Sequence, residues 1–414
     1  MNSSCSKTAL ESSSECENSE ANEHDVDVTL SSGRIEEMEK HPIVIDARNA
    51  GGQVLRIANA LSFLTKKPIT AQNIRQHRGL RESHTHQVDM VVTMSNGKAE
   101  GNEEGSIEYT LWPREAKMIA NEKISLESKC EFIPTLQAVL PCFVFGKETS
   151  TLRWLGDMSM SRNADAIYFC QSVLRFVLRK FGVHFDIVTT TDDEGAEKTI
   201  VTVDSTKELK GVTMMTSCDR NIREIRATIF WEDSESKKKD CVNVREFEKH
   251  CIQTLKEEFG TDILIHCKTK YSVRHDETLS SLQLEVVTSD ECILPEYAIW
   301  YSWCSSDREA KRIVSKAVLR CKRAYDNGVC VQGLLTDQIL LFMALAKGTS
   351  TIRSDYPLPD DHWEKAISVI EELLDVKFSV RIDSEKEFVD ISCEGIGMQN
   401  ENFFDYIAES VFSM

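Results

Sequence analysis

One pattern, an amphipathic helix that leads directly into a strand, recurs along this chain of 414 residues and constrains its fold more than any other feature. The pattern covers residues 56–75, 169–190 and 362–382. In each stretch apolar residues first recur at helical spacing and then alternate as in a strand. Short links from helix to strand favour layered α/β packing. We therefore expect an α/β (α+β layered) protein with a main domain of three repeated helix-on-sheet units, although any α/β protein alternates helices with strands.

A fourth helix-then-strand stretch, residues 244–270, has different surroundings. A charged turn is expected before it, at residues 234–240. Three strands are expected around it, at residues 225–231, 262–268 and 282–288. These elements can form a small α/β domain inserted between the second and third units. A helix at residues 307–326 is then expected to return the chain to the main domain.

The first 40 residues differ in composition from the rest of the chain. The whole chain has a net charge of −18; residues 1–40 carry ten acidic and three basic side chains and so contribute −7, and the remainder contributes −11. A segment rich in Ser, Glu and Asn has too few apolar side chains to offset the entropy lost on folding. We predict a disordered acidic tail at 1–40, a main domain at 41–205 and 304–404, and an inserted domain at 206–303.

Cysteine usage and hydropathy bound the environment of the protein. The 14 cysteines include no Cys-x-x-Cys pair, and the sequence has neither a signal peptide nor a run of 18 apolar residues. We expect a reduced, soluble protein without a membrane partner, located in the nucleus or the cytoplasm, with the nucleus preferred. Because the chain is acidic, a nucleic acid would have to bind through a local basic groove.

A strand, a turn and a helix are predicted in succession near the start of the main domain. The strand ends at Asp46, residues 51–53 (Gly-Gly-Gln) form the turn, and the helix begins at Val54. This order brings free backbone N–H groups and Arg56 to one place, as in an anion site. Two adjacent glycines are also common in plain turns.

Residues 74–84 gather three arginines and two histidines, namely Arg75, His77, Arg78, Arg81 and His84. An arginine can form two parallel hydrogen bonds to a phosphate, which a lysine cannot. In an acidic protein such a cluster indicates an anionic partner, and the phosphates of a nucleic acid fit that description. The alternative is a solvated loop whose arginines pair with nearby glutamates.

A helix is predicted to begin near His362, because apolar residues recur at helical spacing from Ala366 to Leu374. Asp361 can act as the N-cap and Glu364 can return the bond, as in a capping box. The positive end of the helix dipole disfavours a positive charge on His362, so its imidazole stays neutral and can attack a phosphoryl group. The alternative is a surface histidine on a capped helix.

Asp337 and Gln338 lie together inside an otherwise apolar run, residues 334–346. We predict that this polar pair and His362, which begins the next helix, frame one shallow site. Of all features read from the residues alone, this pairing is the clearest indication of function.

A series of short motifs resembles those of RNA 3′-terminal phosphate cyclases, along about residues 42–404. The motifs are Gly-Gly-Gln-x-Leu-Arg at 51–56, Ile-Arg-x-x-Arg and Gly-Leu-Arg-x-x-His within 74–84, Glu-Gly-Ser at 104–106, Gln137 with Pro141, Asp165, Asp337-Gln338 with Phe-Met-Ala-Leu-Ala-x-Gly at 342–348, and Glu-Gly-Ile-Gly-Met-x-Asn at 394–400. Each motif alone is weak, but their order and spacing together are specific. The family architecture, three repeated α/β units with a small inserted domain, agrees with the pattern described above.

The resemblance implies ATP-dependent conversion of an RNA 3′-phosphate to a 2′,3′-cyclic phosphate. His362 matches the family histidine, which attacks the α-phosphate of ATP to give a histidyl–AMP intermediate with the help of Mg²⁺ or Mn²⁺, whose protein ligands are unknown here. AMP then passes to the RNA 3′-phosphate, and the neighbouring 2′-hydroxyl displaces it. The implied partners are ATP and RNA 3′ ends, and protein partners are unknown. The residues implied to bind nucleotide or phosphate are Gln53, Arg56, Arg75, Arg78, Arg81, Gln137, Asp337 and Gln338.

The chain departs from the family pattern where backbone and ligand would meet. Asn49 stands where the family has an acidic residue expected to contact the metal, and Ala50 replaces a glycine. Arg78 runs straight into Gly79 without the family's Ser-Thr-Pro link. These departures favour a second interpretation, a non-catalytic cyclase-like RNA-binding protein, or pseudoenzyme, that acts in rRNA processing or ribosome assembly. Retention of His362 favours the enzyme.

Overall fold

The computed structural model describes the chain in eleven stretches. They are residues 41–48, 51–114, 123–127, 131–155, 164–191, 197–232, 244–272, 279–301, 307–357, 362–401 and 403. The predicted tail at 1–40 and the predicted charged turn at 234–240 lie outside the described residues. The same holds for Asn49, Ala50 and Asp361, and for the side chain of His362.

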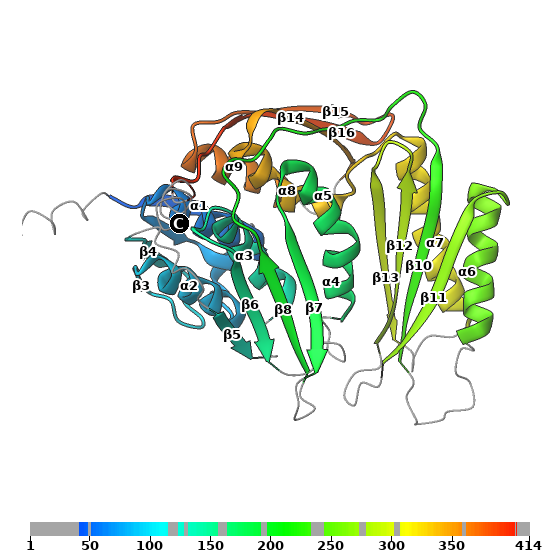
Figure 1. The fold of residues 1–414 in the computed structure, drawn as a ribbon, viewed down its shortest axis with the longest axis horizontal. Coiled ribbons are helices and arrows are strands. Elements are labelled where there is room, and N and C mark those ends of the chain that lie inside the picture. Colours follow the sequence, from blue (N-terminus) through cyan, green and yellow to red (C-terminus); the bar gives the residue numbers. More distant parts are fainter. Residues whose placement is uncertain are drawn as a thin grey trace, which may run out of the picture. The chain divides into compact units, whose positions relative to one another are not determined.

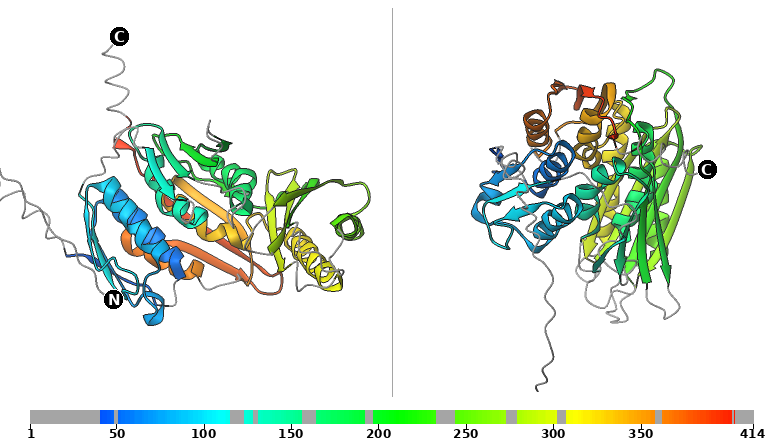
Figure 2. Two further views of the ribbon diagram at one scale, coloured as in Figure 1. Left: turned by 90° about the horizontal axis from the view of Figure 1, so that it is seen from below. Right: turned by 60° about the vertical axis from the view of Figure 1, so that its left-hand side comes forward.

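Helices and four-stranded sheets alternate through the described ranges, which confirms the predicted α/β class. The first sheet has the strand order β1-β2-β4-β3. Its strands are β1 (Ile43–Asp46), β2 (Ile69–Gln72), β3 (Lys98–Glu100) and β4 (Tyr109–Trp112). Helices α1 (Gly51–Thr65) and α2 (Glu82–Ser95) pack side by side against this sheet (Figure 2). A 3-10 turn, η3 (Ile74–His77), precedes α2.

The second sheet has the strand order β5-β6-β8-β7. Its strands are β5 (Lys123–Glu127), β6 (Ser150–Leu155), β7 (Phe185–Thr191) and β8 (Glu197–Val203). Helix α3 (Phe132–Val144) links the first two strands. A second helical rod follows β6 and is made of α4 (Ala164–Phe169), the π-helical segment η4 (Cys170–Leu174) and α5 (Arg175–Phe181). A π-helical segment inside a helix often marks a functional site.

The third sheet has the strand order β9-β14-β16-β15. Its strands are β9 (Thr213–Met214), β14 (Lys347–Asp355), β15 (Phe378–Asp383) and β16 (Phe388–Ile396). Helix α8 (Gly333–Leu345) precedes β14, and α9 (His362–Leu373) lies between β14 and β15. Helix α9 thus begins at the residue where the sequence predicted a helix start.

The three sheets share one arrangement. In each, the first strand is parallel to the second, and the fourth strand runs antiparallel between the second and the third. The predicted stretches at 169–190 and 362–382 end in edge strands, whereas the stretch at 56–75 ends in β2, which pairs on both sides. The first stretch is therefore not equivalent to the other two, because local periodicity cannot tell a central strand from an edge strand. True repetition of the units stays a prediction.

The chain forms a fourth sheet between β9 and α8 in the sequence, with the strand order β11-β10-β12-β13. Its strands are β10 (Ile222–Glu232), β11 (Leu264–Ser272), β12 (Leu279–Thr288) and β13 (Ile293–Tyr301). Helices α6 (Val244–Phe259) and α7 (Asp307–Asp326) both cover one face of it (Figure 1). The domain boundaries drawn from the sequence stay a prediction.

Helix α7 belongs to this fourth sheet. Its buried Val314, Val318 and Cys321 pack in one core with Phe247 of α6 and Trp300 of β13. The expectation that this helix returns the chain to the main domain was wrong; residues 327–332, after α7, make that return. An apolar stripe shows that a helix covers a sheet, but it does not show which sheet.

The other face of the fourth sheet meets α4 and η4 through polar groups. Ser281 Oγ donates to Asp165 Oδ2 at 2.8 Å, and the hydroxyl of Tyr297 donates to the same carboxylate. Ser172 Oγ donates to Glu285 Oε1 at 2.6 Å. Hydrogen bonds are joined here by an edge-to-face contact of Tyr168 with Phe230, whereas the α6 and α7 face rests on apolar packing. No helix in the described part of the chain is long and apolar enough to cross a membrane.

Candidate functional site

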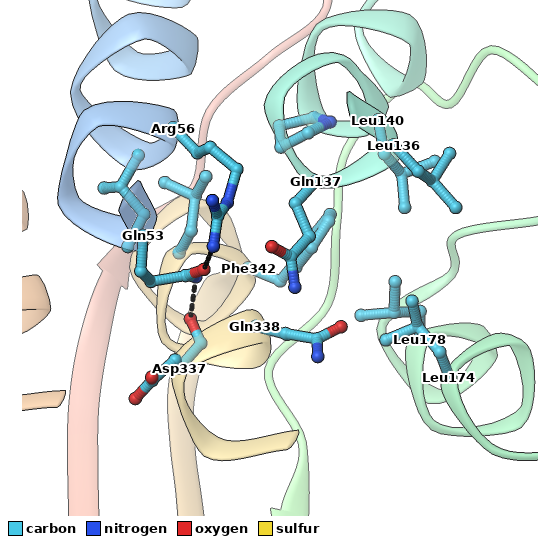
Figure 3. Close-up of a pocket in the computed structure, with 13 residues that line it drawn as sticks. Gln53, Arg56, Leu136, Gln137, Leu140, Leu174, Leu178, Asp337, Gln338 and Phe342 are labelled. Atoms are coloured by element: carbon cyan, nitrogen blue, oxygen red, sulfur yellow. Dashed lines mark hydrogen bonds between the residues drawn. The ribbon is translucent and has the colours of Figure 1, made fainter. Parts of the chain in front are cut away.

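Five of the predicted site residues line one cavity among α1, α3, α8 and the η4–α5 rod. They are Gln53, Arg56, Gln137, Asp337 and Gln338. The opposite wall is apolar and includes Leu136, Leu140, Leu174, Leu178 and Phe342 (Figure 3). The helices that supply the polar residues are far apart in the sequence. The cavity therefore exists only when α1, α3, α8 and the η4–α5 rod have packed together.

A chain of hydrogen bonds closes one side of the cavity. Arg56 Nη2 donates to Gln53 Oε1 at 2.7 Å, and Gln53 Nε2 donates to the backbone oxygen of Asp337 at 3.3 Å (Figure 3). Burial lowers the pKa of Arg56 to about 10, while Glu131 and Asp337 act in the opposite direction. Arg56 therefore keeps its positive charge at neutral pH. Its Nε is buried without a hydrogen-bond partner among the described residues, which leaves one donor for a ligand.

The side chain of Gln137 presents one acceptor with no partner among the described residues. Its side-chain Oε1 is buried and makes no hydrogen bond. Pro141 lies inside α3, four residues further on, and has no N–H to give to the Gln137 carbonyl. The open space beside these groups is about 20 Å³, enough for about one water molecule. A larger ligand would have to displace the side chains of Arg56 and its neighbours.

The predicted arginine cluster is brought together at the end of α1. Burial lowers the pKa of Arg75, and the nearby charges of Arg81 and Arg78 lower it further. Arg75 has a positive φ of 50°, a left-handed conformation that is uncommon for a residue with a side chain. Among the described residues no ion pair is found for these three arginines. The alternative of a loop neutralised by glutamates is therefore not what the structure contains.

Two motifs noted in the sequence hold this cluster in place by touching each other. Leu80 N donates to Ser106 O and Gly105 N donates to Leu80 O, both at 2.9 Å. A Cβ at Gly79, whose φ is +68°, would lie only 2.1 Å from Gly105 O. Only glycine permits this approach at Gly79, whereas Gly105 is favoured by its own positive φ of +87°.

His84 is a candidate site residue that the sequence analysis did not assign to a role. Arg81 N donates to His84 Nδ1 at 3.0 Å, so the neutral ring carries its proton on Nε2. Burial lowers the pKa of His84 to about 4, and so do the charges of neighbouring arginines, namely Arg56, Arg75 and Arg81. A Cβ at Gly52 would lie 2.8 Å from both His84 Nε2 and Arg56 Nη1. The spacing of three residues from Arg81 to His84 was the available signal.

The first turn of α1 lies beside Arg56 and His84. Gly51, Gly52 and Gln53 are helical residues, so their interpretation as a turn before the helix was wrong. The N–H groups of a first helical turn have no partner within the helix, and acidic side chains are absent from this one. Free N–H groups, the helix dipole and the surrounding arginines together make an anion site. Arg56 belongs both to this anion site and to the cavity.

For the predicted nucleophile, His362, the structure gives the position of its helix. Helix α9 begins at His362 and packs against both α1 and α8, which carry Arg56 and Gln338. The side chain of His362 lies outside the described residues, so the predicted site that pairs His362 with Asp337 and Gln338 stays a prediction. A separate cavity of about 810 Å³ lies beside α5, β7 and Arg226, and none of the predicted site residues lines it.

The fold and this site define a layered α/β protein with an arginine-rich anion site beside a small polar cavity. The chain belongs to the RNA 3′-terminal phosphate cyclase family, whose model matches residues 47–380. The resemblance drawn from the sequence motifs is thus confirmed.

Individual relatives differ in how much of their length the match covers. The chain is 35% identical over 150 residues to the RNA 3′-terminal phosphate cyclase of Pyrococcus furiosus and 32% identical over 140 residues to that of Thermococcus sibiricus. These matches cover 35% and 33% of this chain, and only 43% and 39% of the two relatives. The RNA 3′-terminal phosphate cyclase of Drosophila melanogaster is 24% identical over 381 residues, which is 85% of this chain and 95% of that relative. Among solved structures, the enolpyruvyl transferase NikO from Streptomyces tendae has 10% identity and a TM-score of 0.34, covering 86% of this chain and 48% of that chain, a likeness too low to carry an argument.

Proposed function

We propose that this protein converts an RNA 3′-phosphate to a 2′,3′-cyclic phosphate at the expense of ATP, with His362 as the nucleophile. The observation that carries the proposal is that Arg56 joins the anion site at α1 to the polar cavity, in a chain of the cyclase family. One cation can then contact a phosphate while the neighbouring cavity takes the attached nucleoside. Helix α9 packs against the helices that carry both parts of this site.

The proposed reaction has three displacements at phosphorus. An imidazole nitrogen of His362 forms a bond to the α-phosphorus of ATP, and pyrophosphate leaves. An oxygen of the RNA 3′-phosphate then attacks the same phosphorus, and His362 leaves, so that AMP is joined to the RNA end through a P–O–P bond. The 2′-hydroxyl loses its proton, attacks the 3′-phosphorus and expels AMP. Each step has a good leaving group, which direct loss of water would lack.

The described residues suit distinct tasks in this scheme. Arg56, Arg75 and Arg81 would hold phosphate oxygens, and they compensate negative charge that builds up in the displacement. The unpartnered side-chain oxygen of Gln137 suits an N–H donor, such as the exocyclic amino group of a base. Gln53 would keep Arg56 oriented, and Gln338 would contact the nucleotide.

A divalent cation would find one carboxylate at this cavity. Asp337 is the acidic residue among those that line it. Magnesium ions in nucleotide sites commonly use one or two carboxylates together with phosphate oxygens and water. The carboxylate of Asp337 is turned away from Gln137 and Gln338 (Figure 3), so Asp337 would have to turn toward the cavity to hold Mg²⁺ or Mn²⁺, which would neutralise phosphate charge during the attack by His362.

The test is adduct formation with ATP labelled at the α-phosphate, in the presence of Mg²⁺ or Mn²⁺. We expect an acid-labile, alkali-stable AMP adduct on the wild-type protein and on His86→Ala, a control histidine on α2 whose side chain is 33% exposed, but not on His362→Ala. The free energy of unfolding of His362→Ala should lie within about 1 kcal/mol of the wild-type value, so that loss of the adduct reports on chemistry and not on unfolding. An adduct that persists in His362→Ala would refute the assigned nucleophile.

One observation favours the second candidate, a cyclase-like RNA-binding protein without catalysis. The open space of about 20 Å³ is far below the several hundred Å³ of a typical small-molecule site. If this closed cavity is the permanent state, the arginine cluster still binds RNA phosphate but ATP does not enter. Absence of an adduct with either metal, together with retained RNA binding, would support this candidate and reject the enzyme.

A further inference from the structure

Three side chains that can ligate a metal converge far from the proposed nucleotide site. A carboxylate oxygen of Asp290 and the sulfur atoms of Cys292 and Cys330 all lie within 4.8 Å of one another. Cys292 and Cys330 are buried, and Asp290 is half-buried. The first two residues belong to the turn between β12 and β13, and the third to the segment between α7 and α8.

A buried arginine beside this group makes no hydrogen bond. The side chain of Arg220 is 4% exposed, and its three nitrogen atoms have no hydrogen-bond partner among the described residues. It forms an ion pair with Asp290, with 3.6 Å between Nε and Oδ1, and lies over the ring of Tyr325. A buried guanidinium without hydrogen-bond acceptors is costly. Thiolate sulfurs at Cys292 and Cys330 would add acceptors and negative charge beside Asp290.

The carboxylate of Asp290 is already oriented by neighbours. Ser217 N donates to its Oδ2 at 3.3 Å, and the hydroxyl of Thr288 donates to its Oδ1. Metal-ligating carboxylates are commonly held in this way by hydrogen bonds from surrounding groups. The arrangement therefore resembles a prepared ligand and not an acid free to rotate.

We propose that Asp290, Cys292 and Cys330 bind one Zn²⁺ ion, with Arg220 as its charge-balancing neighbour. Two thiolates and one carboxylate suit zinc, which binds sulfur readily and takes water where the protein supplies only three of its four ligands, whereas Mg²⁺ and Ca²⁺ prefer oxygen alone. Binding replaces the two thiol protons by Zn²⁺. The ion and its three ligands then carry a net charge of −1, which the guanidinium of Arg220 neutralises.

The site lies where the chain enters and leaves the fourth sheet. The hydroxyl of Thr216, on the entering segment, donates to the backbone oxygen of Gly328 on the leaving segment. Arg220 and Cys330 belong to these same two segments, while Cys292 is buried in the core shared by the other three sheets. A bound zinc ion would therefore fix the β12–β13 turn both to the segment that enters the fourth sheet and to the segment that leaves it. This role is independent of the proposed function.

The test measures metal in protein purified without chelators and without a metal-binding tag. We expect elemental mass spectrometry to find roughly one zinc ion per chain. Removal of zinc and titration with Co²⁺ should give the visible absorption of tetrahedral cobalt with sulfur ligands. Cys292→Ser and Cys330→Ser should each lower metal affinity at least about tenfold, and Asp290→Asn does the same with the least change in shape.

The matched control is Cys251→Ser. Cys251 of α6 and Cys267 of β11 are also neighbouring thiols, but a third ligand does not complete a group with them among the described residues. This variant should keep the metal of the wild type. No zinc and no cobalt spectrum on the wild-type protein would overturn the proposal. So would a Cys292–Cys330 disulfide, detected as a mass lower by two hydrogens that a reductant restores.

Discussion

Gly52 matters at the residue scale because its missing side chain leaves room for two others, the ends of Arg56 and His84. In Gly52→Ala the new methyl group would displace both ends, so we expect affinity for ATP or pyrophosphate to fall about tenfold or more, which is about 1.4 kcal/mol. Stability should fall by only about 1–2 kcal/mol, because the gain of up to about 1 kcal/mol from alanine in a helix partly offsets the cost of displacing the buried ends of Arg56 and His84. Calorimetric titration and urea unfolding measure the two effects. Unchanged affinity would mean that ligands do not approach α1 here.

Because its pKa is lowered on folding, His84 makes the free energy of unfolding fall as the pH is lowered. Its pKa is about 4 when folded and about 6.5 when unfolded, so between these values the unfolded chain binds the proton and the folded chain does not. The wild-type protein therefore loses stability as the pH falls through this window. Relative to His84→Gln, we expect a loss of about 2 kcal/mol at pH 5 and none at pH 8. Equal pH profiles in urea unfolding would show that the ring is protonated when folded.

Much of the candidate site followed from the motifs that resemble the cyclase family, and only Asp337 and Gln338 stood out as polar residues inside an apolar run. Gln53, Arg56, Gln137 and Gln338, which the resemblance implied to bind nucleotide or phosphate, line one cavity, and their binding role stays a prediction. His84 was not predicted, since its role depends on the backbone N–H of Arg81 and on the space above Gly52. Such features arise from tertiary packing and leave no composition signal.

At the scale of elements, one cross-strand pair fixes β14 against β16. Arg353 and Asp390 lie directly opposite, with Nε to Oδ1 at 2.7 Å and Nη2 to Oδ2 at 3.0 Å. The guanidinium also lies over the ring of Phe388, 3.8 Å from its centroid. Because both partners are largely buried, a double-mutant cycle with Arg353→Ala and Asp390→Ala should give a coupling of about 1–2 kcal/mol.

The matched control is a pair of opposite charges on an exposed strand. Lys98 Nζ lies 3.2 Å from Glu100 Oε1 on β3, and both side chains are more than half exposed. The same cycle there should give less than about 0.5 kcal/mol. Equal couplings at the two sites would mean that burial and two-point contact add nothing at Arg353.

Sequence patterns located helices better than strands at this scale. Helices α6 and α7 have the bounds that apolar periodicity predicted, since each has one buried stripe. Strand β13 was missed because Pro295 interrupts its pattern. A proline is tolerated there because β13 is an edge strand, whose outward N–H groups need no partner in the sheet. Edge position is a property of the assembled sheet and is not visible locally.

At the scale of the whole molecule, the fourth sheet should be removable. The segments that enter and leave this sheet touch through Thr216 and Gly328, and the sheet meets α4 and η4 largely through hydrogen bonds that water can replace, with a few apolar contacts such as Tyr168 on Phe230. We expect a variant with residues 217–327 replaced by a short Gly-Ser linker to fold and to unfold in one cooperative transition. Its stability should be lower, because Val287 and Ile293 leave the main core. Circular dichroism and urea unfolding test this, and an unfolded product would show that the parts are interdependent.

The parallel pairing of β9 with β14 sets an order of events during protein synthesis. Thr213 pairs with Thr351 and Met214 with Ile352, so the partners are more than a hundred residues apart. The first two sheets can close while the ribosome is still translating, but β9 must wait for its partner on the order of 10 s. The third sheet, which also carries the helix that begins at His362, is completed last. A nascent chain should therefore acquire its proposed chemistry only after the final strands leave the ribosome.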